Sequence, residues 1–142
     1  MSAVPRIPLQ LYIIHLVLML SPAAFAAVIY FIVLPGDKGE GLPKDQVVVF
    51  QTIAAALAVI AVGFSQLIPR FMMRPGLKIP MQKYTSMKIV QWAMLESSAL
   101  FIGVVFYMTH EKNMLIPLGI LIALMSLLRP TIYEIERYKI GE

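Results

Sequence analysis

Four apolar stretches, separated by clusters of charged residues, dominate the pattern of hydrophobic and polar positions along the chain. They cover residues 9–34, 47–68, 89–108 and 114–128. The first two contain no Asp, Glu, Lys or Arg, and the third contains a single charged residue, Glu96. A bilayer core of about 30 Å needs roughly 20 helical residues. The first three stretches therefore predict membrane-spanning helices, and the fourth is one turn short.

We count the fourth stretch as a span as well. The charged group of Arg129 can reach the membrane surface from its end, and residues 131–133 can extend the helix into the interface. The sequence thus predicts an all-α, polytopic membrane protein. Its single domain, residues 1–142, would hold four transmembrane helices arranged as two tandem hairpins. The triplet 24–26 resembles a signal-peptidase site, but the apolar run continues to Leu34, which favours a retained span.

Lys and Arg are distributed unequally among the segments that join these spans. Nine of the twelve lie in the N-terminal segment, the loop 69–88 and the tail 129–142, which places both termini and that loop in the cytoplasm. We expect the basic loop to contact anionic lipid headgroups. Its five cations are Arg70, Arg74, Lys78, Lys83 and Lys88.

The composition excludes several classes of protein. Apolar residues make up 59% of the chain, charged residues only 14%, and the mean hydropathy is +0.79. A soluble domain has about a quarter charged residues, so a soluble enzyme, a disordered chain and a nucleic-acid-binding module are excluded. There is no Cys, no glycine-rich phosphate loop, no Ser-His-Asp set and no second intramembrane carboxylate for acid–base chemistry. We therefore expect no catalytic activity and no metal site.

The first and third stretches resemble each other when one is shifted by 76 positions. Residues 21–31 and 97–107 are then identical at four of eleven positions. Both hairpins would start on the cytoplasmic side, which is typical of a parallel repeat related by an axis along the membrane normal. Chance similarity between apolar segments is equally compatible with this match, so the sequence leaves the duplication open.

Polar residues inside the spans are candidates for function. Glu96 is the eighth residue of its span, where an isolated charged carboxylate is costly. The residues leave two interpretations open: Glu96 binds a proton or cation, or it is protonated and fixes packing through an interhelical hydrogen bond. Ser97, Gln91 and His15 belong to the same set. For His15, a hydrogen bond to a neighbouring carbonyl or to Glu96 is favoured over cofactor ligation.

Small residues at helical spacing predict close packing of helices. They lie on the second and third spans, at Ala55, Ala58, Gly63, Ala99 and Gly103. The spacing does not show whether the contacts lie within one chain or between copies. The tail predicts a short helix at the cytoplasmic surface or a segment that docks on a partner.

The segment Trp92–Val105, in which Glu96 is followed by small residues and then an aliphatic stretch with Gly103, resembles the ion-binding helix of proteolipid (c-type) subunits of rotary ATPases. The resemblance implies an oligomeric ring in which Glu96 binds and releases a proton or cation. Two departures are evident. In that family the carboxylate lies on the second helix of its hairpin, and the other helix is rich in Gly where this chain has mostly Ala.

Two functions remain as hypotheses. The first is a small non-catalytic subunit that packs into a larger membrane complex, respiratory or photosynthetic. The alternative is the proteolipid-like ion carrier with Glu96 as its binding group. We expect membrane lipids and other integral subunits or copies of the chain as partners, and no nucleic acid. We predict no cofactor but expect bound lipid, and contact with a pigment or quinone stays open. The expected location is a bacterial inner membrane.

Overall fold

The computed structural model describes residues 7–36, 41–73, 79–137 and 140–141, and these residues are almost entirely helical. Helix α1 (Leu9–Val28) continues through one π-helical turn, η1 (Ile29–Val33), into α2 (Leu34–Gly36). Two 29-residue helices follow, α3 (Lys44–Met72) and α4 (Met81–Thr109). The remaining elements are β1 (Ile79–Pro80), η2 (Lys112–Met114), α5 (Leu115–Leu127), α6 (Ile132–Arg137) and β2 (Ile140–Gly141).

Prolines set the starts of the three long helices. Pro8, Pro43 and Pro80 are the N-cap residues of α1, α3 and α4, with φ between −53° and −59°. Their ψ values are extended, so the chain turns into the helix directly after the ring. At its other end α4 stops at His110, whose left-handed backbone (φ 55°) turns the chain toward η2. The long helices therefore extend beyond the apolar stretches that predict them.

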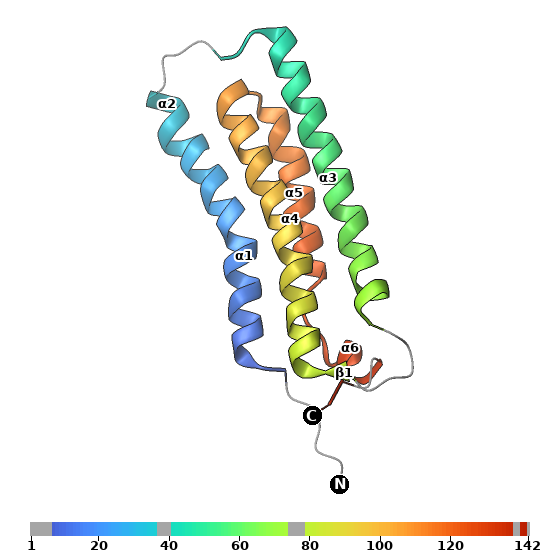
Figure 1. Cartoon of the computed structure of the whole chain (residues 1–142). Helices are drawn as coiled ribbons and strands as arrows, with labels where there is room; N and C mark the ends of the chain where they lie inside the picture. Colours follow the sequence, from blue (N-terminus) through green and yellow to red (C-terminus); the bar gives the residue numbers. More distant parts are fainter. Residues whose placement is uncertain (1–6, 37–40, 74–78, 138–139, 142) are drawn as a thin grey trace.

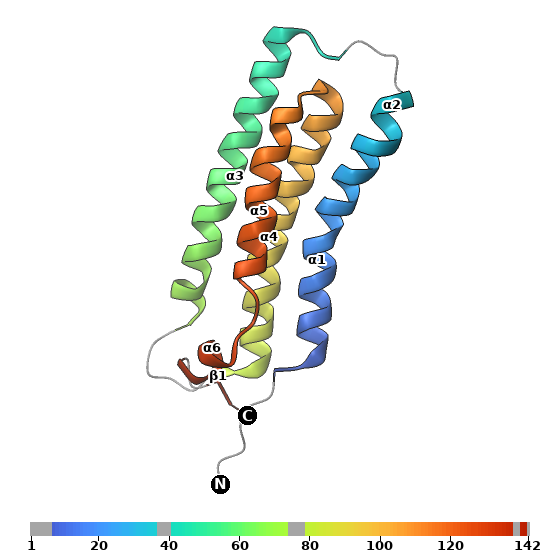
Figure 2. The same ribbon diagram turned by 180° about the vertical axis from the view of Figure 1, so that it is seen from behind.

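Helix α4 is the centre of the bundle. It packs against α1, α3 and α5, and α4 and α5 lie between α1 and α3 (Figures 1 and 2). Half of its most apolar window is buried, against 17% for α1 and 17% for α3. Its buried side chains point toward all three neighbours, whereas α1 and α3 turn most of their apolar surface outward.

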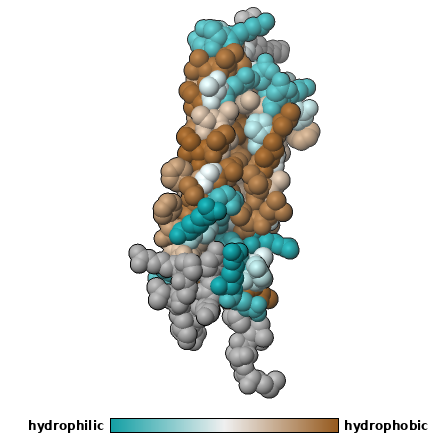
Figure 3. Space-filling model, turned by 90° about the vertical axis from the view of Figure 1, so that its right-hand side faces the viewer, coloured by the Kyte–Doolittle hydropathy of each residue, from teal (hydrophilic) through white to brown (hydrophobic). Residues whose placement is uncertain are grey.

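Among the residues that the structure describes, three helices are long and apolar enough to cross a membrane, namely Leu9–Gly36, Lys44–Met72 and Met81–Thr109. Large apolar side chains are exposed along α1 and α3, among them Val17, Phe31, Val59 and Phe64. Seen from the side of α3, a hydrophobic band lies between two more hydrophilic ends (Figure 3). Such a surface is stable only against lipid or other protein. The chain is an α-helical membrane protein.

The packing departs from two tandem hairpins. Helices α4 and α5 pair as expected, but α1 and α3 lie on opposite sides of them (Figure 1). A two-fold axis along the bundle would pair α1 with α3 as it pairs α4 with α5, so the helices do not follow the expected repeat axis. Two residues that the 76-residue shift aligns, Tyr30 and Phe106, do lie at the same level along the bundle axis, because their rings stack with centroids 6.4 Å apart. The helices do not follow the repeat axis because α4, which is buried on several sides, takes the centre of the bundle.

The tail folds back on the end of the bundle where α1 begins (Figure 1). Strands β1 and β2 pair in parallel, with Ile79 opposite Ile140. Ile135 of α6 is fully buried, and Thr131 accepts a hydrogen bond from the backbone of Glu134. The short helix expected in the tail is therefore present and docks on its own chain.

Replacing Gly103 with Leu should destabilise the bundle. A Cβ atom at Gly103 would lie 2.8 Å from the Phe25 ring of α1, so a larger side chain must displace that ring from the α1–α4 contact. We expect a loss of about 1–3 kcal/mol, measured by thermal unfolding in detergent. Gly119→Leu is the matched control, because a Cβ there meets nothing within 4 Å. Equal effects of the two changes would contradict the close contact, whereas partial rescue by Phe25→Ala would support it.

Candidate functional site

The carboxyl end of α5 is the centre of the main polar cluster. Helix α5 has only 13 residues and ends at Leu127, so its last carbonyl groups lie inside the bundle. The Trp92 indole donates to the Leu128 carbonyl oxygen at 3.0 Å, and the Lys88 ammonium lies 3.4 Å from the same oxygen. Leu128 lies just beyond the last residue of α5, so its carbonyl has no partner within that helix. We call these donors, together with His15, the α5 cap.

His15 reaches the same helix end from α1. Its Nε2 lies 2.8 Å from the Met125 carbonyl oxygen. A carbonyl only accepts, so Nε2 must carry the proton. The imidazole also packs on the Trp92 indole, with ring centroids 4.6 Å apart. His15 is therefore bonded to a neighbouring carbonyl, one of the two partners favoured from the sequence.

Lys88 does not lie at the lipid surface, where the sequence analysis places it. It lies inside α4, 1% exposed, and its Nζ forms an ion pair with Glu134 of α6 at 2.8 Å. Tyr84 donates to the other carboxylate oxygen of Glu134, also at 2.8 Å. The expected headgroup contact is therefore wrong for Lys88. The prediction is wrong because α4 begins at Met81, and on this helix Lys88 shares the inward side with Tyr84 while Lys83 stays exposed.

Of the other four basic residues of loop 69–88, two are described by the structure and two are not. Arg70 and Lys83 are exposed near the end of the bundle where α6 docks, a position open to headgroups. Arg74 and Lys78 lie outside the described residues. Within the described ranges, no group of three or more His, Cys, Asp or Glu residues could hold a metal ion.

A second polar layer lies between α3 and α4. The Gln91 side-chain amide donates to the Ser65 carbonyl at 2.7 Å, and Gln91 itself is 2% exposed. Its Oε1 and the hydroxyl of Ser98 are both buried and have no hydrogen-bond partner among the described residues. Such groups cost free energy in an apolar setting, so each requires an explanation.

Glu96 lies at the middle of α4, the sixteenth of its 29 residues. Its side chain is half-buried, and within the described part of the chain no hydrogen bond or ion pair of Glu96 is found. Its neighbour Ser97 donates to the Met94 carbonyl oxygen at 3.0 Å. The structure thus brings His15 and Gln91 into the bundle's own hydrogen bonds and leaves Glu96 apart from them.

The small residues divide into two groups. Ala99 and Gly103 are buried where α4 meets α1. On α3, however, the buried small residues are Ala54 and Ala61. Ala55 and Gly63 face outward, Ala58 is half-buried, and a Cβ at Gly63 would meet nothing within 4 Å.

Sequence reasoning missed three members of the polar cluster. In the sequence Trp92 stands out only as the first residue of the segment Trp92–Val105, yet its indole N–H needs an acceptor whenever it is buried. Tyr84 and Glu134 were assigned to a loop and a surface tail. A usable signal was present: Lys88 directly precedes the third apolar stretch, and a cation there needs an anionic partner from another segment.

Comparison of the chain with protein-family models, curated proteins and solved structures found no match. The function must therefore be argued from the residues themselves.

Trp92→Phe should weaken the bundle while keeping its core filled. The change removes the indole N–H and leaves the Leu128 carbonyl with the longer Lys88 contact alone. We expect a loss of about 1–3 kcal/mol in unfolding free energy, measured by thermal or denaturant unfolding. Tyr107→Phe, which removes a polar atom from an exposed ring on the same helix, serves as control. No difference between the two variants would show that the α5 cap does not contribute.

Removing either partner of the ion pair should have unequal effects. Lys88 is 1% exposed and Glu134 is 29% exposed. Leaving the Lys88 charge unpaired should therefore destabilise the protein more than leaving the Glu134 charge unpaired. We expect Glu134→Ala to cost about 3–5 kcal/mol and Lys88→Met about 1–3 kcal/mol. Lys83→Met, at an exposed site, should change the unfolding temperature little. The reverse order of the two losses would contradict the burial difference.

Proposed function

We propose that this protein is a small non-catalytic subunit that packs into a larger membrane complex and stabilises it. One observation carries the proposal. The polar side chains of the α5 cap and Gln91 bond to backbone carbonyls of the chain itself, and so hold its own helices in place. A chain that uses its internal polar groups in this way acts through its outer surface.

The outer surface of α3 fits contact with another protein. Ala55 and Gly63 lie exposed on one side of the helix, between large apolar residues such as Val59. Small residues let two helix backbones approach closely in a membrane, where dispersion and not the hydrophobic effect drives association. Because α1 and α3 occupy opposite sides of the bundle, the α3 surface is separate from the internal contacts of α1.

The proposed orientation places both termini in the cytoplasm, with α5 as a fourth and shorter crossing. Its support is the excess of Lys and Arg in the segments that join the spans. Exposed Arg70 and Lys83 would then contact headgroups of the cytoplasmic leaflet of a bacterial inner membrane. Helix α1 begins, and α6 docks, at this same end (Figure 1).

A second candidate function rests on Glu96. A carboxylate at the middle of a spanning helix, half-buried and outside the internal hydrogen-bond network, is suited to bind a proton or cation. In that case several copies of the chain would assemble, with Glu96 at a repeated interface. The likeness of Trp92–Val105 to the ion-binding helix of rotary-ATPase proteolipids supports this alternative.

Native mass spectrometry of mildly solubilised protein from its own membrane distinguishes the two functions. Release together with larger, different chains is the expected result. In that experiment Gly63→Leu should abolish co-release, because it adds bulk to the outward face of α3 without touching the bundle. Gly119→Leu, equally unhindered on α5, should leave co-release intact.

A series of identical 15.9 kDa subunits would instead overturn the accessory role and favour the ion carrier. Glu96→Gln should then abolish ion-coupled activity without loss of assembly. If Gly63→Leu leaves co-release intact, the partner does not bind the α3 surface.

A further inference from the structure

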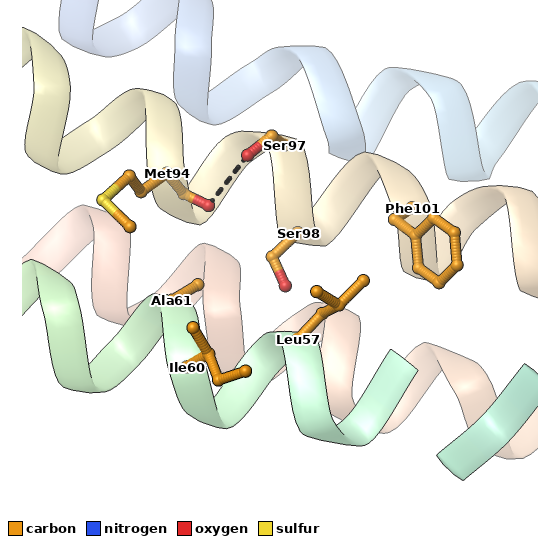
Figure 4. A pocket seen from close by; sticks show the side chains of 7 residues that line it. All are labelled: Leu57, Ile60, Ala61, Met94, Ser97, Ser98 and Phe101. Atoms are coloured by element: carbon orange, nitrogen blue, oxygen red, sulfur yellow. Dashed lines mark hydrogen bonds between the residues drawn. The ribbon is translucent and has the colours of Figure 1, made fainter. Parts of the chain in front are cut away.

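A groove opens on the outer surface between α3 and α4, near the middle of both helices (Figure 4). Its volume is about 300 Å³. Leu57 and Ile60 of α3 form one wall, and Met94 and Phe101 of α4 form the other. Both α3 residues are more than one-third exposed, so the groove is open to the surface that faces lipid. It lies apart from the α5 cap.

Two serines of α4 lie in the lining of this otherwise apolar groove, Ser97 and Ser98. The Ser98 hydroxyl is directed from α4 toward α3, and the residue is 6% exposed (Figure 4). A serine inside a helix usually donates to the carbonyl four residues earlier, here Met94. That carbonyl already accepts from Ser97 at 3.0 Å. Ser98 therefore has no partner among the described residues.

We propose that this groove binds a lipid-soluble molecule whose carbonyl oxygen accepts a hydrogen bond from Ser98, the chemistry of a quinone ring. A bound carbonyl would satisfy the one unpaired hydroxyl of the groove. The walls suit an apolar ring, because Phe101 offers an aromatic face and Met94 a polarizable thioether. The volume is at the lower end of the range for small-molecule sites, which is roughly 300–1,000 Å³.

The depth of Ser98 argues against a phospholipid as the occupant. Ser98 lies about 25 Å from the Met81 end of α4 and about 16 Å from the Thr109 end, at 1.5 Å per residue. The apolar core of a bilayer is about 30 Å thick, and the ester carbonyls of phospholipids lie outside it. An acyl chain could fill the groove but could not supply an acceptor at this depth. A ring carbonyl on an apolar molecule can.

The single tryptophan of the chain provides the readout. Trp92 precedes Ser98 by six residues on α4, about 9 Å along the helix axis. A quinone bound in the groove should therefore quench its fluorescence. The protein, in phosphatidylcholine nanodiscs, is titrated with decylubiquinone, and the expected result is saturable quenching. Quenching that rises linearly with quinone in the membrane, without saturation, would overturn the proposal.

Variants separate the hydrogen bond from the apolar fit. Ser98→Ala should weaken decylubiquinone binding about fivefold, since it removes one hydrogen-bond donor. Leu57→Phe should weaken it further by narrowing the groove. Ser126→Ala on α5 is the matched control and should change nothing, because Ser126 is exposed on another helix. Equal affinities of Ser98→Ala and the unaltered chain would overturn the proposal. So would equal binding of decylbenzene, which has no carbonyl, measured by its displacement of decylubiquinone.

Discussion

The arrangement of this bundle depends on how the carboxyl end of α5 is satisfied inside an apolar environment. Each unpaired carbonyl in a membrane interior costs several kcal/mol, and no water is present to replace the missing partner. Lys88 and Trp92 of α4 meet this need at the Leu128 carbonyl, and His15 of α1 adds a second hydrogen bond to the Met125 carbonyl, which already accepts from the Leu128 N–H at 3.2 Å. The same contacts fix the rotation of α1 and α4 about their axes.

The same contacts lie directly beyond the last residue of α5. Trp92 and Lys88 donate to the carbonyl of Leu128, the residue that follows the helix. The chain then leaves the helix at Leu128, passes Pro130 and returns as α6, whose Glu134 neutralises Lys88. Non-helical backbone is tolerated at such depth only where protein surrounds it. The α5 cap and Glu134 thus stabilise the end of a short helix. This structural role explains their burial without a transported ion.

Much of the architecture could be predicted from hydrophobic runs, because a membrane helix must be apolar over a set length. The three long helices and their all-α class followed from that rule alone. The central place of α4 did not, since Val59 and Val105 look alike in sequence although one is exposed and the other buried. The sequence indicates that Lys88, next to an apolar stretch, needs an anionic partner, but it does not identify Glu134, which lies 46 residues away in the chain.

The candidate site shows the same division. Glu96, Gln91 and His15 could be singled out because polar groups are rare in apolar stretches. The role of each residue depends on its neighbours from other helices, and these contacts cannot be predicted from the sequence. Ser97 and Ser98 are adjacent and chemically identical. Only the fold shows that Ser97 takes the carbonyl Ser98 would use, so that one hydroxyl is satisfied and the other is not.

The order in which the α5 cap is assembled has a consequence for synthesis. Donors in α1 and α4 leave the ribosome before the Met125 and Leu128 carbonyls that they bind. Until α5 has been made, Trp92 and Lys88 lack the Leu128 carbonyl as an acceptor, and His15 lacks the Met125 carbonyl. Helix α5, with only 13 residues, then packs against donors that are already in place. The α5 cap can therefore form only after the carboxyl-terminal part of the bundle has been synthesised.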